Sequence, residues 1–461
     1  MIDPRVASGL RDIPPASMIP RERMTATFRK TFADFGFVPI ETPHIERMEV
    51  LTGKGAGSDE VLRQIYEVTN KGGEPGELAL RFDLTVPLAR FVARHINELG
   101  RPFKRYAIGS VFRGERPAKG RFREFVQCDF DAVGTESPVA DAEIAQVIYS
   151  ALTAAGVPAF TIALNNRKIL DAHLDGLGLA DRSGPILRAL DKLAKIGAEG
   201  VRDVLQGRGP GDPDEPGAVG AALSEDQARR VLDFVESGRG GVEVLDTAEA
   251  AVGSDPRGAE GIANLRTIFG LLDAAGVPAD RLRVDLGLAR GLDYYTGVVF
   301  ETTVDGREKF GSVASGGRYD NLTRLFTDQP LPGVGASIGL DRLLALLEEA
   351  GLAKGASTTV PVLLPNFPGA DARHAVALAA RLRAAGIGAE VYPDAIQAGK
   401  QLQYGSTRGH RLAVIVGPSE QDARTFNLRD LATRQERKAI PWDDLEAEVA
   451  HALGAGPGAG R

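Results

Sequence analysis

The stretch "RYAIGSVFRGERPAKGRFREFVQCDFDAVG", residues 105–134, contains two segments of strand-type residues on either side of a polar loop. The segments 105–115 and 123–134 are rich in aromatic and β-branched residues, and the loop 116–121 holds proline and glycine. This pattern is typical of a long antiparallel hairpin. The sequence therefore predicts a fold built on an antiparallel sheet, with this hairpin inside it.

Polar residues are expected to share one face of the hairpin. Because successive residues of a strand point to opposite faces, Arg113 and Glu115 project together from the first strand. On the return strand an aromatic residue and three polar ones share a face: Phe125, Gln127, Asp129 and Asp131. A guanidinium fork suits phosphate oxygens, and an aromatic ring suits adenine. Charged runs are more often solvated surface, so the hairpin alone leaves a nucleotide-phosphate site and a plain solvated hairpin both open.

The composition is that of a globular protein with two or three domains. The chain of 461 residues is too long for one ordinary core, and its 43% hydrophobic and 25% charged residues are typical values. The formal net charge of −7 does not exclude a nucleic-acid partner, since a local basic patch is enough for binding.

Several classes of protein are not expected. The single Cys128 argues against an internal disulfide framework and fits a cytoplasmic location. The six histidines lack ligand spacing, so no residue is assigned as a metal ligand. Residues 1–20 have no apolar signal-peptide core, and no apolar run approaches the ~18 residues of a membrane span.

The first half of the chain shows alternating strand and helix patterns. A helix is expected over 20–35, and 77–92 is expected to be a strand followed by a helix that begins near Thr85. Apolar residues at helical spacing between 144 and 155 predict an amphipathic helix that ends at Gly156.

The second half divides into an insertion and two further segments. Helical segments over 180–279 surround a Gly/Pro-rich loop, which favours an inserted helical module, although ordinary helices of the main domain stay open as an alternative. Strand patterns return after residue 280, and Arg342 is expected at the start of a helix. We expect a catalytic domain over 1–352, a linker over 353–359, a small α/β domain over 360–453 and a disordered tail over 454–461.

Five stretches of the sequence, taken together, resemble the histidyl-tRNA synthetases. FADFGFVPIETP (32–43) and FRGERPAKGRFREFVQCDFD (112–131) resemble class II motifs 1 and 2, of which motif 1 forms the dimer interface. ARGLDYYTGVVFE (289–301) resembles the histidine-specific signature, and GVGASIGLDRL (333–343) resembles motif 3. AGKQLQYGSTRG (398–409) resembles part of the anticodon-binding domain. The resemblance implies an α+β class II catalytic domain on an antiparallel sheet, with a helical insertion and a C-terminal α/β anticodon-binding domain.

For ATP, the resemblance implies a set of phosphate and base contacts. Arg113 matches the motif 2 arginine on the α-phosphate, and Arg290 matches the catalytic arginine, which lies opposite that phosphate and binds histidine beside its carboxylate. Three further positions match contacts to the β- and γ-phosphates and the nucleotide: Arg121, Arg342 and Glu115. Phe125 matches the residue that stacks on adenine, and Mg²⁺ is expected to accompany ATP.

For histidine, the resemblance implies contacts to both ends of the amino acid. Asp83, Thr85 and Gln127 match the positions that hold the α-amino group. A neutral imidazole has one N–H donor and one acceptor nitrogen. Asp131 and Tyr295, next to Tyr294 in the signature, match positions that satisfy both.

The implied activity is that of a histidine–tRNA ligase. It activates L-histidine with ATP and transfers it to histidine tRNA, and the implied protein is a cytoplasmic homodimer without a membrane segment. Two relatives without this activity are alternatives: the regulatory subunit of ATP phosphoribosyltransferase and a tRNA-sensing module. The first usually lacks the C-terminal domain and the arginines of motif 2, which this chain keeps.

Overall fold

The computed structural model describes residues 2–53, 63–69, 72–73, 76–118, 120–208, 221–289, 295–352 and 357–454. These residues form two compact units, each of which is described separately below. The first comprises Met1–Asp12 and Met24–Leu352, and the second comprises Ile13–Arg23 and Ala353–Arg461.

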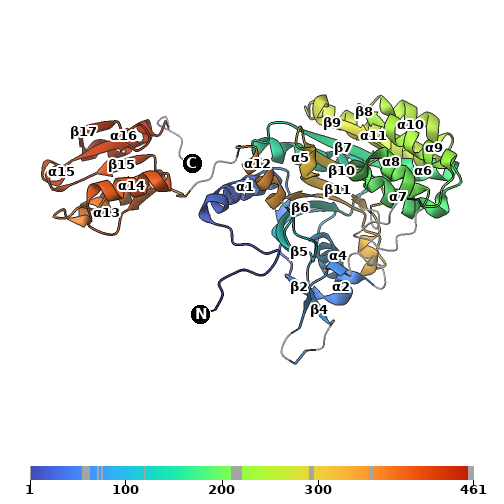
Figure 1. Cartoon of the computed structure of the whole chain (residues 1–461), viewed down its shortest axis with the longest axis horizontal. Coiled ribbons are helices and arrows are strands. Elements are labelled where there is room, and N and C mark those ends of the chain that lie inside the picture. The colour runs from blue at the N-terminus through green and yellow to red at the C-terminus, as the bar shows by residue number, and fades with distance from the viewer. Residues whose placement is uncertain are drawn as a thin grey trace. The chain divides into compact units, whose positions relative to one another are not determined.

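A nine-stranded sheet forms the centre of the first unit, in the order β1-β5-β6-β12-β11-β10-β7-β9-β8 (Figure 1). Its middle pairs are antiparallel, whereas β1 with β5 and β7 with β9 are parallel. The strands are β1 (Val38–Pro39), β5 (Phe103–Phe112), β6 (Glu124–Val133), β7 (Phe160–Asn166), β8 (Arg239–Gly240), β9 (Leu282–Asp285), β10 (Val298–Val304), β11 (Ala314–Tyr319) and β12 (Gly333–Gly339). The predicted mixed fold on an antiparallel-rich sheet is confirmed.

The predicted hairpin is the pair β5–β6, which stays in register from Phe103 opposite Val133 to Phe112 opposite Glu124. Regular strand pairing ends at Phe112, so Arg113 and Glu115 follow the strand rather than lie in it. The N–H of Arg113 still bonds to the carbonyl of Arg123 across the hairpin, but the N–H of Gly114 bonds instead to the carbonyl of Gln64, both at 2.8 Å.

Long helices cover one face of this sheet. They include α1 (Pro15–Asp34), α5 (Pro138–Ala154), α6 (Arg167–Gly176) and α11 (Pro256–Ala274). The predicted amphipathic helix is α5, which begins where Ser137 accepts a hydrogen bond from the N–H of Val139. Its apolar stripe is buried against the sheet: Ile144, Val147, Ile148, Ala151 and Leu152.

The other face of the sheet carries smaller elements. A three-stranded sheet consists of β2 (Ile45–Arg47), β4 (Leu78–Leu80) and β3 (Glu67–Val68), with the short helix α2 (Met48–Thr52) beside it. Helix α4 (Thr85–Arg94) begins at Thr85, as predicted, and Asp83 accepts hydrogen bonds from the N–H groups of Thr85 and Val86. The carboxylate thus caps the helix start.

Between residues 180 and 274 the described chain is mostly helical. The elements are η1 (Ala180–Arg182), α7 (Ser183–Asp191), α8 (Leu193–Leu205), α9 (Glu225–Ser237) and α10 (Val244–Val252), followed by α11. Helix α11 packs on α5 and α6, so the last helix of the predicted insertion belongs to the layer beneath the sheet. The Gly/Pro-rich loop over 209–220 lies outside the described residues.

The C-terminal part of the chain forms a five-stranded sheet in the order β14-β13-β15-β16-β17. Its strands are β13 (Val362–Leu364), β14 (Ala389–Val391), β15 (Leu412–Ile415), β16 (Thr425–Asp430) and β17 (Glu436–Pro441). Its helices are α13 (Ala372–Ala384), α14 (Ala398–Arg408), α15 (Pro418–Ala423) and α16 (Leu445–Ala452). The predicted small α/β fold is confirmed. Over the part of the chain that the structure describes, every helix is too short or too polar to cross a bilayer.

Candidate active site

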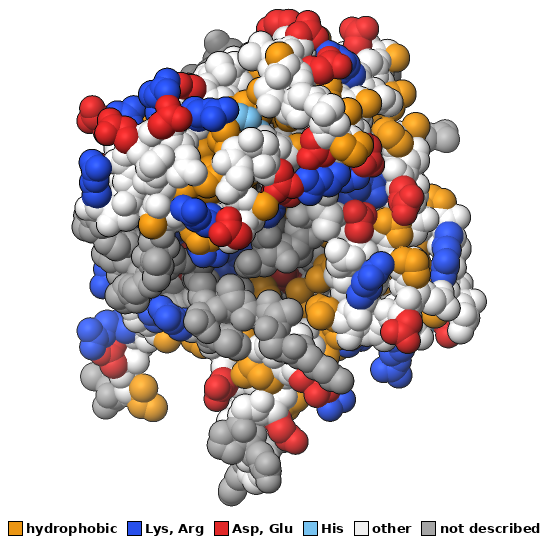
Figure 2. Space-filling view, turned by 90° about the vertical axis from the view of Figure 1, so that its right-hand side faces the viewer, with side chains coloured by type: hydrophobic (Ala, Val, Ile, Leu, Met, Phe, Trp, Pro, Cys, Tyr) orange, Lys and Arg blue, Asp and Glu red, His pale blue; other side chains and the backbone are white. Residues whose placement is uncertain are grey.

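A cavity of about 240 Å³, partly open to solvent, is lined by residues from the start of β6 and the end of β12. Six of the residues predicted from the sequence line it: Arg113, Glu115, Arg121, Phe125, Gln127 and Arg342. The hairpin supplies five of them, and α12 (Leu340–Glu349) supplies Arg342 from its first turn, as predicted. The face of the molecule shown in Figure 2 is hollowed near its centre, with basic and acidic side chains around the hollow.

Backbone carbonyls orient two of the three arginines. Arg113 donates from Nε to the carbonyl of Phe82 at 3.0 Å, and its guanidinium lies 5.2 Å from the centre of the Phe125 ring. Arg342 donates from Nη1 to the carbonyl of Ser312 at 2.7 Å. A carbonyl fixes a guanidinium without cancelling its charge, so both cations stay able to attract an anion.

One carboxylate, Glu115, lies between two of these arginines. It is 3.8 Å from Arg113 and 3.7 Å from Arg121, which are the distances of loose ion pairs. Such partly exposed pairs contribute little stability. A polyphosphate can therefore displace Glu115 from either arginine at small cost.

The floor of the cavity is built from small residues. Ala314 and Ser315 of β11 and Ser337 and Gly339 of β12 face it, where larger side chains would fill the space. Gln127 donates to the hydroxyl of Ser337 at 3.2 Å and marks the inner end of the cavity.

Beyond Gln127 the same face of the sheet carries a buried polar cluster. Asp131 lies 2.6 Å from Arg105 as an ion pair, and it accepts a hydrogen bond from the hydroxyl of Tyr319, also at 2.6 Å. The ring of Tyr295 covers Gly317, since a Cβ there would come within 2.8 Å of that ring. Phe125, predicted to contact ATP, and Gln127 and Asp131, predicted to contact histidine, thus lie on one face of β6.

Comparisons with known proteins agree with this geometry. The family model described as histidyl-tRNA synthetase matches residues 9–343, and the anticodon-binding domain model matches residues 362–451. The histidine–tRNA ligase of Rhodopirellula baltica is 48% identical over 437 residues, covering 95% of each chain. The chain belongs to the histidyl-tRNA synthetase family.

Further relatives cover nearly the whole synthetase. The histidine–tRNA ligase of Wolinella succinogenes is 42% identical over 98% of this chain and 99% of its own. The crystal structure of the histidyl-tRNA synthetase from Nostoc sp. PCC 7120 has a TM-score of 0.85 at 33% identity and covers 98% of this chain and 100% of its own. The family's reaction is the ATP-dependent joining of histidine to tRNA, in two steps.

Two residues of the signature, Arg290 and Tyr294, lie outside the described residues of the synthetase, as does Lys119 of the motif 2 loop. The chain re-enters the described structure at Tyr295. Thr296 then bonds through its N–H to the carbonyl of Arg318 at 2.8 Å and through its hydroxyl to Asp320 at 2.5 Å. These bonds fix the C-terminal end of the signature loop.

Sequence reasoning missed the two partners of Asp131. Arg105 is fully buried and directly opposite Asp131 in the hairpin register, and Tyr319 lies two strands away on β11. The alternating pattern that placed Asp131 on the polar face also places Arg105 there, so the hairpin register could have identified the arginine. Nothing local to the hairpin could have identified Tyr319.

The N-terminal segment also contributes to the site. Arg11 pairs with Asp341 of α12 at 2.5 Å, and the other oxygen of Asp341 accepts the N–H of Val126 at 2.7 Å. The Arg11 guanidinium lies 3.6 Å from the centre of the Phe122 ring. Arg11 therefore ties the first residues of the synthetase to both motif 2 and motif 3.

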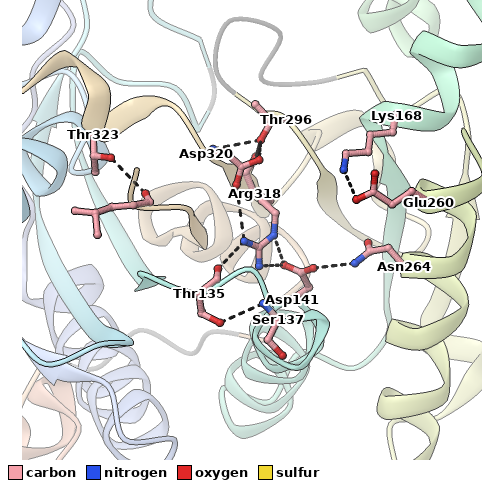
Figure 3. A network of polar contacts seen from close by, with 11 residues as sticks. Thr135, Ser137, Asp141, Lys168, Glu260, Asn264, Thr296, Arg318, Asp320 and Thr323 are labelled. Carbon is pink, nitrogen blue, oxygen red and sulfur yellow. Dashed lines mark hydrogen bonds and ion pairs between the residues drawn. The ribbon is translucent and has the colours of Figure 1, made fainter. Parts of the chain in front are cut away.

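A second polar network lies beneath the sheet, on the helix-covered face (Figure 3). Arg318 of β11 donates from Nε and Nη2 to Asp141 of α5, at 2.9 and 2.6 Å, and from Nη1 to the carbonyl of Thr135 at 2.7 Å. The other oxygen of Asp141 accepts from Asn264 of α11 at 3.1 Å. The network joins α5, α11 and the strand that bonds Thr296.

Proposed function

We propose that the cavity binds ATP for the synthesis of histidyl-adenylate. Three arginines around one cavity, beside an aromatic ring that can stack on adenine, are the observation that carries this proposal. Arg113 contacts the α-phosphate, and Arg121 and Arg342 contact the β- and γ-phosphates. Phe125 stacks on adenine, and Glu115 holds the nucleotide.

Histidine binds at the inner end, beyond Gln127. Asp83, Thr85 and Gln127 take its α-amino group, and Asp131 accepts the imidazole N–H. Tyr319 and Arg105 hold Asp131 in place, since both lie 2.6 Å from it. Tyr295 donates to the other imidazole nitrogen, with Tyr294 beside it. A pocket that pairs both nitrogens rejects analogues lacking either group.

The chemistry requires positioning and charge stabilisation rather than a covalent enzyme intermediate. The histidine carboxylate attacks the α-phosphorus, and pyrophosphate leaves on the opposite side. Negative charge on the α-phosphate oxygens is stabilised by Arg113 and, in this proposal, by Arg290. Fixed cations lower the barrier because they need no reorganisation when the charge develops.

The lining of the cavity fits Mg²⁺ bound through the phosphates. Magnesium usually keeps several waters and takes one or two carboxylates plus substrate oxygens. Glu115, held only by two loose ion pairs, can serve as such a carboxylate, whereas Asp341 is bonded to Arg11 and Val126. The ion would neutralise part of the polyphosphate charge.

Three finer features belong to the same proposal. The tRNA is histidine tRNA, with its anticodon bound by the C-terminal domain. The enzyme is a homodimer through the motif 1 segment, 32–43, and works in the cytoplasm.

Histidine-dependent exchange of pyrophosphate into ATP tests the proposal, with the same mixture lacking histidine as its control. Exchange that needs histidine supports it, and aminoacylation of histidine tRNA but not of other tRNAs completes it. A purified, folded chain without histidine-dependent exchange would refute it and would favour a non-catalytic relative.

A further inference from the structure

Asp129 is a buried carboxyl group for which the ATP and histidine contacts described above give no role. It lies on β6 between Gln127 and Asp131, and only 2% of its surface is exposed. The Ser337 side chain lies near it and acts to lower its pKa. Its Oδ1 atom has no hydrogen-bond partner among the described residues, and neither does Oε1 of Gln127.

The charges around Asp129 do not balance. Asp83, Asp129 and Asp131 are 7%, 2% and 3% exposed; the fully buried Arg105 acts on all three, and Arg113 acts on Asp83 as well. Arg81 is also near, but its guanidinium donates to the carbonyls of Ser110 and Thr42. The three buried carboxylates are therefore not fully neutralised by the arginines around them.

This imbalance changes the acidity of the group. Loss of hydration on burial raises the pKa of Asp129 to about 7, and Asp131 and Asp83 add to the rise while Arg105 opposes it. A buried carboxylate without a full set of donors is costly, and a bound cation removes that cost.

The missing partner can be described by its chemistry. Two unsatisfied acceptors, Oδ1 of Asp129 and Oε1 of Gln127, come from residues two apart on one strand, so both side chains project from the same face. An ammonium group has three N–H donors and a positive charge, so it can supply the missing donors and balance the charge. Gln127 lines the cavity, and Asp129 follows it on the same face of β6.

We propose that Asp129 is a substrate-binding residue that accepts a hydrogen bond from the α-ammonium group of histidine, beside Gln127. The inference rests on the proposed function and adds a residue to the amino-acid site. The ammonium contributes the donors that the free protein lacks, and the bound substrate balances the acidic cluster.

The charge state of Asp129 then affects affinity for histidine. Below pH 7 the group holds a proton that must leave before it can pair with the ammonium, so affinity falls as pH falls. With a pKa of about 7, the ionised fraction drops roughly tenfold between pH 8 and pH 6. Other charged groups lie close by, so the comparison must be made against a variant that changes Asp129 alone: Asp83, Asp131, Arg105, Arg81 and, beside Asp83, Arg113.

The experiment uses isothermal titration of the full chain with L-histidine and with 3-(imidazol-4-yl)propanoate, which lacks only the amino group. At pH 8, Asp129→Asn should weaken histidine binding about 10- to 100-fold, because a charged hydrogen bond is lost. Binding of the propanoate should change by less than about threefold. At pH 6 the loss for histidine should shrink by roughly tenfold.

Asp141→Asn is the matched control, since it alters an equally buried carboxylate on the opposite face of the sheet. It should leave the ratio of histidine to propanoate affinity unchanged. Equal weakening of both ligands by Asp129→Asn would overturn the proposal by placing Asp129 at the imidazole. No weakening of either ligand would overturn it as well.

A second measurement follows the proton on Asp129. At pH 7, histidine binding should release about half a proton more from the wild type than from Asp129→Asn, as measured by titration in two buffers of different ionisation enthalpy. Equal release from the two proteins contradicts the proposal. Pyrophosphate exchange by the wild type tests the proposed function separately, so the two can fail independently.

Discussion

Both faces of the central sheet bury charged side chains, but the two sets differ in how completely they are hydrogen-bonded. Beneath the sheet, Asp141 accepts hydrogen bonds on both oxygens and Arg318 donates from three nitrogens. Above it, Arg105 leaves Nε and Nη1 without hydrogen-bond partners in the described structure, and Asp129 leaves Oδ1 without one. A fully paired network stabilises one arrangement of helices and strands, whereas an incompletely paired one is ready to bind a charged ligand.

The largest expected effect comes from breaking the lower network. Asp141→Ala leaves Arg318 buried without its carboxylate, which should destabilise the first unit by about 3–5 kcal/mol. Calorimetry of the full chain should show its transition at a lower temperature. The one tryptophan, Trp442, lies in the second unit, so the fluorescence-detected transition is an internal control that should stay in place. A shift in both transitions would contradict a local role.

The next largest effect comes from the face of the sheet that carries the cavity. It is an effect on the reaction rate and not on stability. Arg113→Ala removes a fixed cation from the α-phosphate and should lower histidine-dependent exchange by ~10²–10³. The Tm should move little, because the side chain is partly exposed and donates to a single carbonyl. If the variant's Tm falls along with its activity, Arg113 stabilises the fold instead of acting on the phosphate.

Two tyrosines near the proposed histidine site allow a test of which groups act on the imidazole. Tyr295→Phe should lower kcat/KM for histidine roughly 10- to 100-fold, because one imidazole nitrogen loses its partner. Tyr319→Phe leaves Asp131 with Arg105 alone and should produce a loss of similar size through the carboxylate. Combining the two changes should give a non-additive loss if both act on the imidazole. Simple additivity would assign them to separate tasks.

The smallest effect is a stabilisation that depends on pH. The pKa of Asp129 is about 7 in the folded protein, above the ordinary value of 3.8, so the folded state holds more protons between these values. Stability from this group is therefore lost as pH rises from about 4 to 7. Asp129→Asn should raise the Tm of the ligand-free protein by about 2–4 °C at pH 8 and hardly at all at pH 5. A variant with a lower Tm at pH 8 would mean that the ionised carboxylate is well paired after all.

The sequence predicted the parts of the site that depend on local pattern. The hairpin, the polar row from Phe125 to Asp131 and the position of Arg342 in the first turn of a helix all follow from alternation or helix signals. The resemblance assigned roles to these residues, and the geometry of the cavity agrees with the ATP set.

What the sequence did not predict depends on contacts between distant segments. Arg11 and Asp341 are 330 residues apart, and Tyr319 meets Asp131 across 188 residues. Arg318 lies inside SGGRYDN, which in the sequence indicates only a glycine-rich turn, whereas the structure makes it a strand residue that holds α5. Such pairs become visible only once strand order is known.

That strand order has a consequence for the protein during its synthesis. Strand β12 (Gly333–Gly339) lies between β6 and β11, both of which leave the ribosome earlier. Until β12 arrives, the nascent chain exposes two unpaired strand edges, and such edges favour pairing with other chains. Because β12 is needed to join the two halves of the sheet, we expect the unit that contains this sheet to complete its fold only after residue 339 has been made.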